Sequence, residues 1–191
     1  MEKQEKLIRA LKKGNEDAFR ELVDKHKHMV YVTAYGFLQE QAAAEDLSQD
    51  VFLEIFNSIE TFKAKSTLST WIYRITVNKS INEVKKQKRK ARETQIDSSF
   101  QNDNNHQNDL PDDEKYTPEA INENNERKIL LKKAIDSLPE KQKTAFILHK
   151  YEEMPYKKIA AIMNSSLSSV EALIHRAKIN LQKELSEYYK T

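Results

Sequence analysis

Apolar residues recur at three- and four-residue intervals through the first half of the chain. Over residues 19–37 the spacing is i, i+3, i+4, i+7, the pattern of a helix with one buried face. The same spacing predicts a second helix over 42–58 and a third that begins near Ser69 and continues through Arg92. The residues expected on the buried sides are Phe19, Leu22, Val23, His26, Met29, Val30, Thr33 and Phe37, then Ala44, Leu47, Val51, Phe52, Ile55, Phe56 and Ile59, then Trp71, Ile72, Ile75, Ile81 and Val84.

The last third of the chain has a tighter signature of short helices. Residues 139–150 and 155–163 are predicted to be helical, and Asn164 to Leu167 to form a turn that lacks glycine. Ser168 and Glu171 have the spacing of a capping box, so a third helix is predicted to begin at Ser168. Its core side would be Val170, Leu173, Ile174, Ala177 and Leu181, against Ile159, Ile162 and Met163. This arrangement predicts a helix-turn-helix.

Residues 93–126 separate the two patterns. The segment is rich in Asn, Asp, Gln and Ser and has almost no apolar periodicity, so we expect a flexible acidic linker. The fold class predicted is all-α, with two small helical bundles, an N-terminal module over 1–92 and a C-terminal helix-turn-helix module over 127–191. We also expect the two modules to be separate units joined by this linker. A continuous hydrophobic interior that also enclosed the last long helix would contradict this division.

Composition excludes several classes of protein. The 191 residues include two glycines and no cysteine, which excludes a glycine-rich phosphate loop, a thiol nucleophile and a cysteine metal site. His26 and His28 are two apart, a spacing that does not place two ligands side by side on a helix. We therefore expect no catalytic residue, no metal site and no cofactor. The charged N-terminus has no secretory signal, and no stretch approaches 18 apolar residues.

Charge is segregated along the chain although the net charge is only +2. Residues 79–92 carry seven basic side chains against one acidic, 93–126 carry ten acidic against one basic, and 127–191 carry thirteen basic against seven acidic. Two basic segments around an acidic one suggest nucleic-acid binding. Solvated helix faces around a disordered linker are an equally acceptable interpretation of charge alone.

Three groups of residues are candidate binding surfaces. On the last helix, hydroxyl and basic side chains face outward as in a helix that enters the major groove, and a basic turn begins the preceding helix. These residues are Ser168, Ser169, Glu171, Ala172, His175, Arg176 and Lys178, with Tyr156, Lys157 and Lys158. A helical protein-binding domain would be capped in the same way.

The second helix presents Asp46, Gln49, Asp50 and Leu53 on one exposed face, which suits a partner helix with arginines. By itself this face is also an ordinary solvated surface. The segment 62–74 places aromatic residues beside hydroxyls and cations, the combination that holds single-stranded nucleic acid. Trp71 is expected in the core, so the surrounding loop is the better candidate for strand contact.

Three motifs in order resemble the ECF (extracytoplasmic-function) group of bacterial sigma factors. They are residues 44–53 (AEDLSQDVFL), residues 68–79 (LSTWIYRITVNK), and Leu138 to Gln142 followed by 156–160 and 175–178. The resemblance implies that the face of Asp46, Gln49, Asp50 and Leu53 docks on the β′ clamp helices of RNA polymerase. It also implies a further contact with the β flap of the polymerase. The helix from Ser168 is implied to read the −35 element as duplex DNA. The resemblance also implies reading of the melted −10 element by Lys63, Lys65, Ser66, Thr67, Leu68, Ser69, Tyr73, Arg74, Asn78 and Lys79.

The same resemblance implies a cytoplasmic location, promoter DNA as a partner, and an anti-sigma factor that in this group is often held at the membrane. Three other classes remain open on the sequence. A helix-turn-helix regulator that acts without polymerase would dimerise on paired half-sites. A recombinase or nuclease would need a nucleophile or metal cluster, and a helical adaptor would not respond to DNA.

Overall fold

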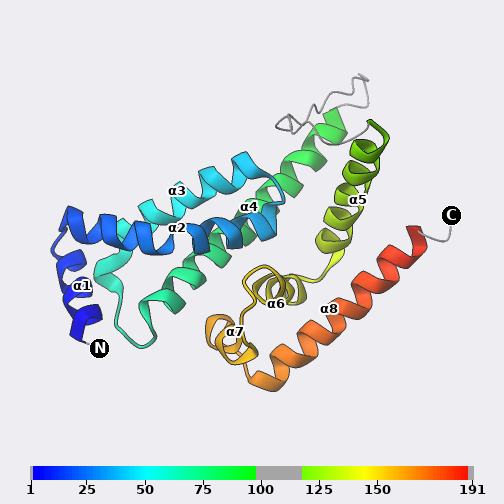
Figure 1. Cartoon of the computed structure of the whole chain (residues 1–191). Coiled ribbons are helices and arrows are strands. Elements are labelled where there is room, and N and C mark those ends of the chain that lie inside the picture. Colours follow the sequence, from blue (N-terminus) through cyan, green and yellow to red (C-terminus); the bar gives the residue numbers. More distant parts are fainter. Residues whose placement is uncertain (1, 98–117, 189–191) are drawn as a thin grey trace.

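The computed structural model describes residues 2–97 and 118–188, and every regular element in them is a helix (Figure 1). The N-terminal bundle comprises α1 (Glu2–Lys12), α2 (Glu16–Leu38), α3 (Gln41–Ser58), a 3₁₀ turn η1 (Ile59–Thr61) and α4 (Leu68–Asp97). The C-terminal bundle comprises α5 (Pro118–Ser137), α6 (Glu140–Lys150), α7 (Tyr156–Met163) and α8 (Leu167–Tyr188). The all-α class with two helical bundles is therefore confirmed.

Local capping explains where the first long helices begin and end. The Asn15 side chain accepts a hydrogen bond from the amide of Ala18 at 2.8 Å and so caps α2. Gln39 ends the helix in the left-handed region (φ 55°), which lets the chain reverse into α3. Leu22, Val30, Val51 and their neighbours meet in the core, as the apolar spacing predicts. Helix α1 was not expected; it closes one end of the bundle with Leu11.

The helix-turn-helix is formed by α7 and α8, and its turn differs from the predicted one. Asn164 takes the left-handed conformation (φ 49°) that glycine often supplies at a helix end. The Ser166 hydroxyl accepts from the amide of Ser169 at 3.2 Å, so Ser166 is the cap of α8. Ser168 lies inside the first turn, and the expected capping box of Ser168 and Glu171 is wrong.

Helix extends into both ends of the expected linker. Helix α4 continues to Asp97 and α5 begins at Pro118, whereas the linker was expected over 93–126. Basic residues such as Lys88 stand toward the end of α4, and the Lys88 ammonium donates to the carbonyl of Asp136 in α5 at 3.1 Å. Residues 98–117, on which the rest of that expectation falls, lie outside the described residues.

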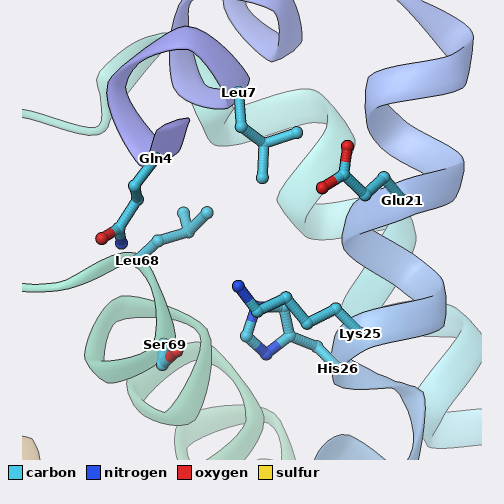
Figure 2. A pocket seen from close by; sticks show the side chains of 7 residues that line it. All are labelled: Gln4, Leu7, Glu21, Lys25, His26, Leu68 and Ser69. Carbon is cyan, nitrogen blue, oxygen red and sulfur yellow. The ribbon is translucent and has the colours of Figure 1, made fainter. Parts of the chain in front are cut away.

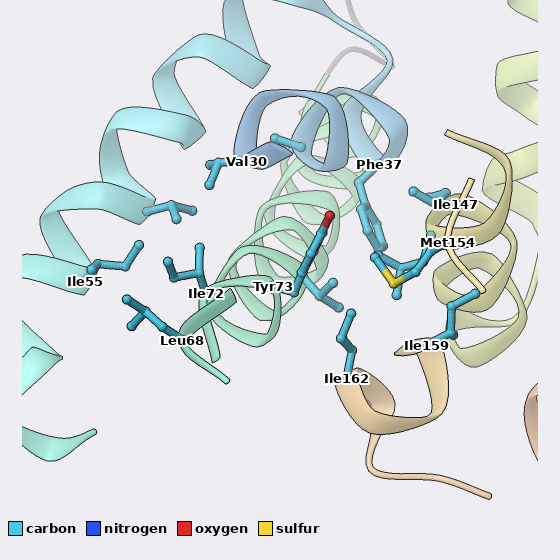
Figure 3. Packing of buried hydrophobic residues seen from close by; sticks show 14 of the residues in the cluster. Val30, Phe37, Ile55, Leu68, Ile72, Tyr73, Ile147, Met154, Ile159 and Ile162 are labelled. Carbon is cyan, nitrogen blue, oxygen red and sulfur yellow. The ribbon is translucent and has the colours of Figure 1, made fainter. Parts of the chain in front are cut away.

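The two bundles share one hydrophobic interior, contrary to the expected separation. A single buried cluster runs from Leu11 through Phe37 and Ile72 to Ile147 and Ile174. Figure 3 shows Phe37 of the first bundle beside Ile147 and Met154 of the second. A smaller cluster of Ala134, Ile135, Leu138, Ala177 and Leu181 joins α5 to α8.

The last long helix is nevertheless not enclosed in that interior. Val170 and Ile174 of α8 are buried, while Glu171, His175 and Arg176 are exposed. The bundles are therefore packed together, contrary to expectation. The last long helix is not enclosed between them, so the candidate DNA face of α8 remains open to solvent.

Candidate nucleic-acid and polymerase interfaces

The outward face of α8 is largely open to solvent. Glu171, Ala172, His175, Arg176 and Lys178 are exposed. Ser168 is also exposed and Ser169 is half-buried beside the Ser166 cap. Because Val170, Ile174 and Ala177 anchor the opposite side in the core, this face is presented rigidly.

The start of α7 contributes a second part of this surface. Lys157 is exposed, and the Tyr156 ring packs edge-on against His149 with centroids 5.0 Å apart. Lys158 behaves differently, because its ammonium lies 4.9 Å from the centre of the Tyr73 ring in α4. Lys158 is thus directed toward the N-terminal bundle.

The candidate polymerase face on α3 is fully presented. Asp46, Gln49 and Asp50 are exposed, and Leu53 is 61% exposed. Phe56, expected in the core, is 50% exposed and lies one turn beyond Leu53. Its ring packs edge-on against Phe19 with centroids 5.1 Å apart. Phe56 therefore extends the apolar part of this face.

The loop before α4 carries exposed cations around a capped helix start. Lys63, Lys65 and Thr67 are exposed and Ser66 is half-buried. The Thr67 hydroxyl accepts from the amide of Thr70 at 3.2 Å and so caps α4. Leu68 is only 2% exposed and packs in the core, so its side chain is not accessible to a DNA strand in this structure.

Further along α4, Tyr73 and Arg74 are covered by the C-terminal bundle. Tyr73 is 4% exposed, and its hydroxyl donates to a carboxylate oxygen of Glu152 at 2.9 Å. Burial, with the charge and hydrogen bond of Glu152, raises the pKa of Tyr73, so the hydroxyl remains a donor. Arg74 donates to the carbonyls of Ala161 at 2.6 Å and Ile162 at 3.3 Å.

The remaining α4 candidates are accessible. Asn78 is exposed, and the Lys79 ammonium lies 3.8 Å from a carboxylate oxygen of Glu54 in α3. The structure thus brings the expected −10 residues onto one loop and one helix, but it leaves Leu68 and Tyr73 inaccessible. The burial of Tyr73 could not be predicted from the apolar spacing of its own helix, because the residue that contacts its hydroxyl, Glu152, lies about eighty positions away in the chain.

A cavity of about 240 Å³ lies beside this loop, between α1, α2 and α4. Figure 2 shows Leu7, His26 and Leu68 around it, with Glu21 and Lys25 at its edge. His26 is buried, and burial together with the charges of Lys25 and Lys158 lowers its pKa. Its neutral ring is therefore part of the packing of α2.

The two segments of the chain match two known family models. Residues 22–90 match Sigma-70 region 2, and residues 128–181 match Sigma-70 region 4. The chain is 29% identical to the ECF RNA polymerase sigma factor SigW of Bacillus subtilis, over 95% of this chain and 96% of that protein. It is 27% identical to the ECF RNA polymerase sigma-E factor of Escherichia coli, over 90% of this chain and 88% of that protein.

The chain belongs to the ECF sigma factors. The fold agrees with that of CnrH, solved in complex with the cytosolic domain of CnrY, at a TM-score of 0.63 and 20% identity over 96% of this chain and 97% of that one. It also agrees with that of the sigma factor RpoE of Bartonella quintana, solved with the anti-sigma factor NepR, at a TM-score of 0.56 and 23% identity over 88% and 96%.

An ECF sigma factor is a transcription initiation factor and not an enzyme. Within residues 2–97 and 118–188 no group of three or more His, Asp or Glu side chains is arranged to hold a metal ion. Over the same part of this sigma factor, none of the helices combines the length and the apolar character needed to cross a bilayer.

The buried His26 of region 2 should make the free energy of unfolding depend on pH. Because the pKa of His26 is lowered in the folded chain, the unfolded chain takes up a proton first as pH falls through 6.5, and the free energy of unfolding falls with it. Urea unfolding at about pH 7.5 and about pH 5.5 should show this loss, and His26→Gln should reduce the difference between the two values. His28→Gln, at an exposed position, should leave the difference unchanged. An equal difference in both variants would contradict the role of His26.

Proposed function

We propose that this sigma factor binds core RNA polymerase through α3 and directs initiation by reading a duplex −35 element with α8 and a melted −10 element with the loop before α4. The observation that carries the proposal is the exposed polar face of α8, held by an apolar opposite side in region 4. An α-helix of this kind fits the major groove, where its side chains reach base edges and phosphates. The first turn of α7, with Tyr156 and Lys157, is suited to the adjacent backbone.

The contact with single-stranded DNA is supported by the residue types on the loop before α4. Lys63 and Lys65 are exposed cations for phosphates, and Thr67 and Ser69 are hydroxyls near the start of the helix. Asn78 and Lys79 continue the same surface along α4. Tyr73 and Arg74 would add a stacking ring and a cation when the C-terminal bundle moves away.

Docking on polymerase is supported by the chemistry of the α3 face. Two carboxylates and an amide surround the exposed Leu53 and Phe56, a combination that fits an arginine-bearing helix such as those of the β′ clamp. Region 4 would bind the β flap. Since CnrH and RpoE were solved with CnrY and with an anti-sigma factor, we also propose an anti-sigma partner for this chain, which would act in the cytoplasm.

Transcription in vitro tests this function directly. The purified chain, mixed with core polymerase and genomic fragments, should give run-off products from defined start sites. Random starts alone would count against the proposal. A regulator that acts without polymerase would instead bind isolated duplex operators as a dimer, so a monomer that requires core polymerase distinguishes the two functions.

Arg176 gives a sharper test of −35 reading. If its guanidinium reads a guanine, Arg176→Ala should weaken binding to the preferred −35 sequence by about 1–3 kcal/mol, or roughly 5–150-fold, and relax preference at that base pair. Promoter binding by the reconstituted holoenzyme to a panel of −35 sequences measures this. Lys178→Ala, at a neighbouring exposed cation, should weaken all sequences alike. A uniform loss for Arg176→Ala would make it a phosphate contact.

A further inference from the structure

We propose that Lys12 of α1 is a positioning residue for the loop over residues 62–67, which the proposed function assigns to the melted −10 strand. The inference rests on that function and concerns a residue outside the family match, which begins at residue 22. It is carried by a contact between segments fifty positions apart, in which the Lys12 ammonium donates a hydrogen bond to the main-chain carbonyl of Phe62 at 2.7 Å. Lys12 does not contact the strand; it fixes the loop that does.

Phe62 is the point at which the loop leaves the core. Its side chain is 4% exposed, and the centre of its ring lies 5.2 Å from that of Trp71. Its amide donates to the carbonyl of Ile59 at 3.1 Å and ends the 3₁₀ turn η1. The carbonyls at the end of a helical turn have no partner within it, so the Phe62 carbonyl is open to a donor from another element. Lys12 supplies a charged donor, which makes a stronger hydrogen bond than a neutral one.

The loop beyond Phe62 does not take its shape from local preference alone. Ala64 has a left-handed backbone (φ 52°), a region that is strained for alanine, and it stands between the exposed cations Lys63 and Lys65. Such a conformation persists where flanking contacts impose it. On the far side the Thr67 hydroxyl caps α4, and on the near side the contacts are those of Phe62. Loss of the near-side hydrogen bond therefore frees the backbone that presents the two lysines.

Helix α1 is fixed well enough to support the loop. Leu11, next to Lys12, is 4% exposed in the core, and Gly14 reverses the chain in the left-handed region (φ 70°) just past the helix end. Figure 2 shows Leu7, one turn before Leu11, facing the same cavity as Leu68 at the start of α4. Helix α1 thus lies close to both ends of the loop, with Lys12 at one end and Leu7 at the other.

Lys12→Met tests this role because it removes the donor and keeps both the apolar stem and the helix. Lys12 is an exposed residue, so the substitution leaves the core intact. If the freed loop keeps its binding conformation for about one fifth of the time, the apparent affinity for the strand falls about fivefold. Titration of the holoenzyme, the full chain with core polymerase, measures this loss. The probe is a single-stranded oligonucleotide with the −10 sequence found upstream of the run-off start sites.

Two matched variants and a second probe control for charge and for general damage. Lys12→Arg keeps a charged donor and should retain the strand affinity of the parent within about twofold. Lys13→Met removes the same charge from the next, exposed position and should also stay within about twofold. Binding of the holoenzyme to duplex −35 DNA should be unchanged in all three variants. A fivefold loss in Lys13→Met as well would assign the effect to the charge of the helix end and overturn the inference.

The mobility of the loop can be measured in the free chain without DNA. In the parent, the NMR order parameters of the Ala64 and Lys65 amides should be those of a rigid backbone, about 0.85, and they should fall toward about 0.6 in Lys12→Met. Lys12→Arg and Lys13→Met should keep the parent values. Order parameters that do not change in Lys12→Met would show that the hydrogen bond to Phe62 does not hold the loop.

A double-mutant cycle separates positioning from direct contact with the strand. A chain that already carries Lys63→Ala and Lys65→Ala lacks the cations that the loop presents, so adding Lys12→Met should lower its strand affinity by less than about twofold. A lysine that itself bound a phosphate would cause the same fivefold loss in both backgrounds, and that result would overturn the inference.

The remaining outcomes also decide the inference. A mobile loop in Lys12→Met with unchanged strand affinity would refute it, because strand binding would then not depend on the position of the loop. If the parent holoenzyme binds the −10 strand no better than a scrambled strand, the proposed strand reading fails and the positioning role fails with it. The order parameters of the free chain still report in that case whether Lys12 holds the loop.

Discussion

Asp50→Arg should reduce the affinity of the sigma factor for core RNA polymerase by about 100-fold or more while sparing the fold. Asp50 is exposed on α3 between Gln49 and the apolar pair of Leu53 and Phe56. Its replacement would put a positive charge against the proposed arginine-bearing helix, and such a juxtaposition costs several kcal/mol. Titration of labelled core polymerase with the full chain measures the effect, and an unchanged thermal unfolding curve would show that the helix is intact.

The control is a change of the same charge elsewhere on region 2. Asp24 is an exposed carboxylate on α2 that pairs with Lys27 at 2.9 Å, in an exposed i,i+3 contact of little energetic weight. Asp24→Arg should lower polymerase affinity by less than about threefold, through long-range charge alone. Equal losses in the two variants would remove the α3 face from the interface.

The helices of this protein were largely predictable from apolar spacing and caps. The predicted helix over 42–58 compares with Gln41–Ser58 in the structure, and the predicted segments 139–150 and 155–163 compare with α6 and α7. Capping patterns were less reliable at the start of α8, where both Ser166 and Ser168 could serve as the N-cap and the structure uses Ser166. Helix α1 escaped prediction because its eleven residues are mostly charged and its apolar stripe is short.

Contacts between distant segments could not be predicted, and they change the site most. Tyr73 lies in a motif that suggests strand reading, yet its environment is set by Glu152 and Lys158 from the other bundle. Phe56 has the spacing of a core residue, but the neighbouring helices leave its side of α3 open. The exposure of Asp46, Gln49, Asp50 and Leu53 could be predicted because these residues share one face of a single helix.

The environment of Lys143 could not be predicted from the sequence. In the sequence it is one of several cations on a basic helix and would be expected at the surface, but its side chain is buried at 5% exposure. Its ammonium is paired with the Asp136 carboxylate of α5 and donates to the carbonyl of Phe37 in α2 at 3.2 Å. Burial lowers the pKa of Lys143, and the hydrogen bond and charge of Asp136 oppose that shift. The Asp136 carboxylate therefore offsets the energetic cost of burying the Lys143 ammonium beside the contact between the bundles.

Asp136→Ala should lower the free energy of unfolding by about 2–3 kcal/mol, because it leaves the Lys143 ammonium buried without its counter-charge. Lys143→Met, which removes the charge and keeps the apolar stem, should change stability by less than about 1 kcal/mol. Asp24→Ala, which breaks an exposed pair, should cost at most about 0.5 kcal/mol. Urea unfolding followed by circular dichroism measures all three variants.

The pH dependence of Asp136→Ala separates this cause from a simple loss of packing. Without the carboxylate, the pKa of Lys143 in the folded chain is lowered further, while in the unfolded chain it keeps its ordinary value. The unfolded chain then binds more protons, so the stability of the variant should rise with pH more steeply than that of the parent chain. Unfolding at about pH 9.5 should therefore recover part of the loss seen at about pH 7. A loss that is the same at both pH values, or a Lys143→Met variant as unstable as Asp136→Ala, would mean that packing and not the unpaired charge destabilises the protein.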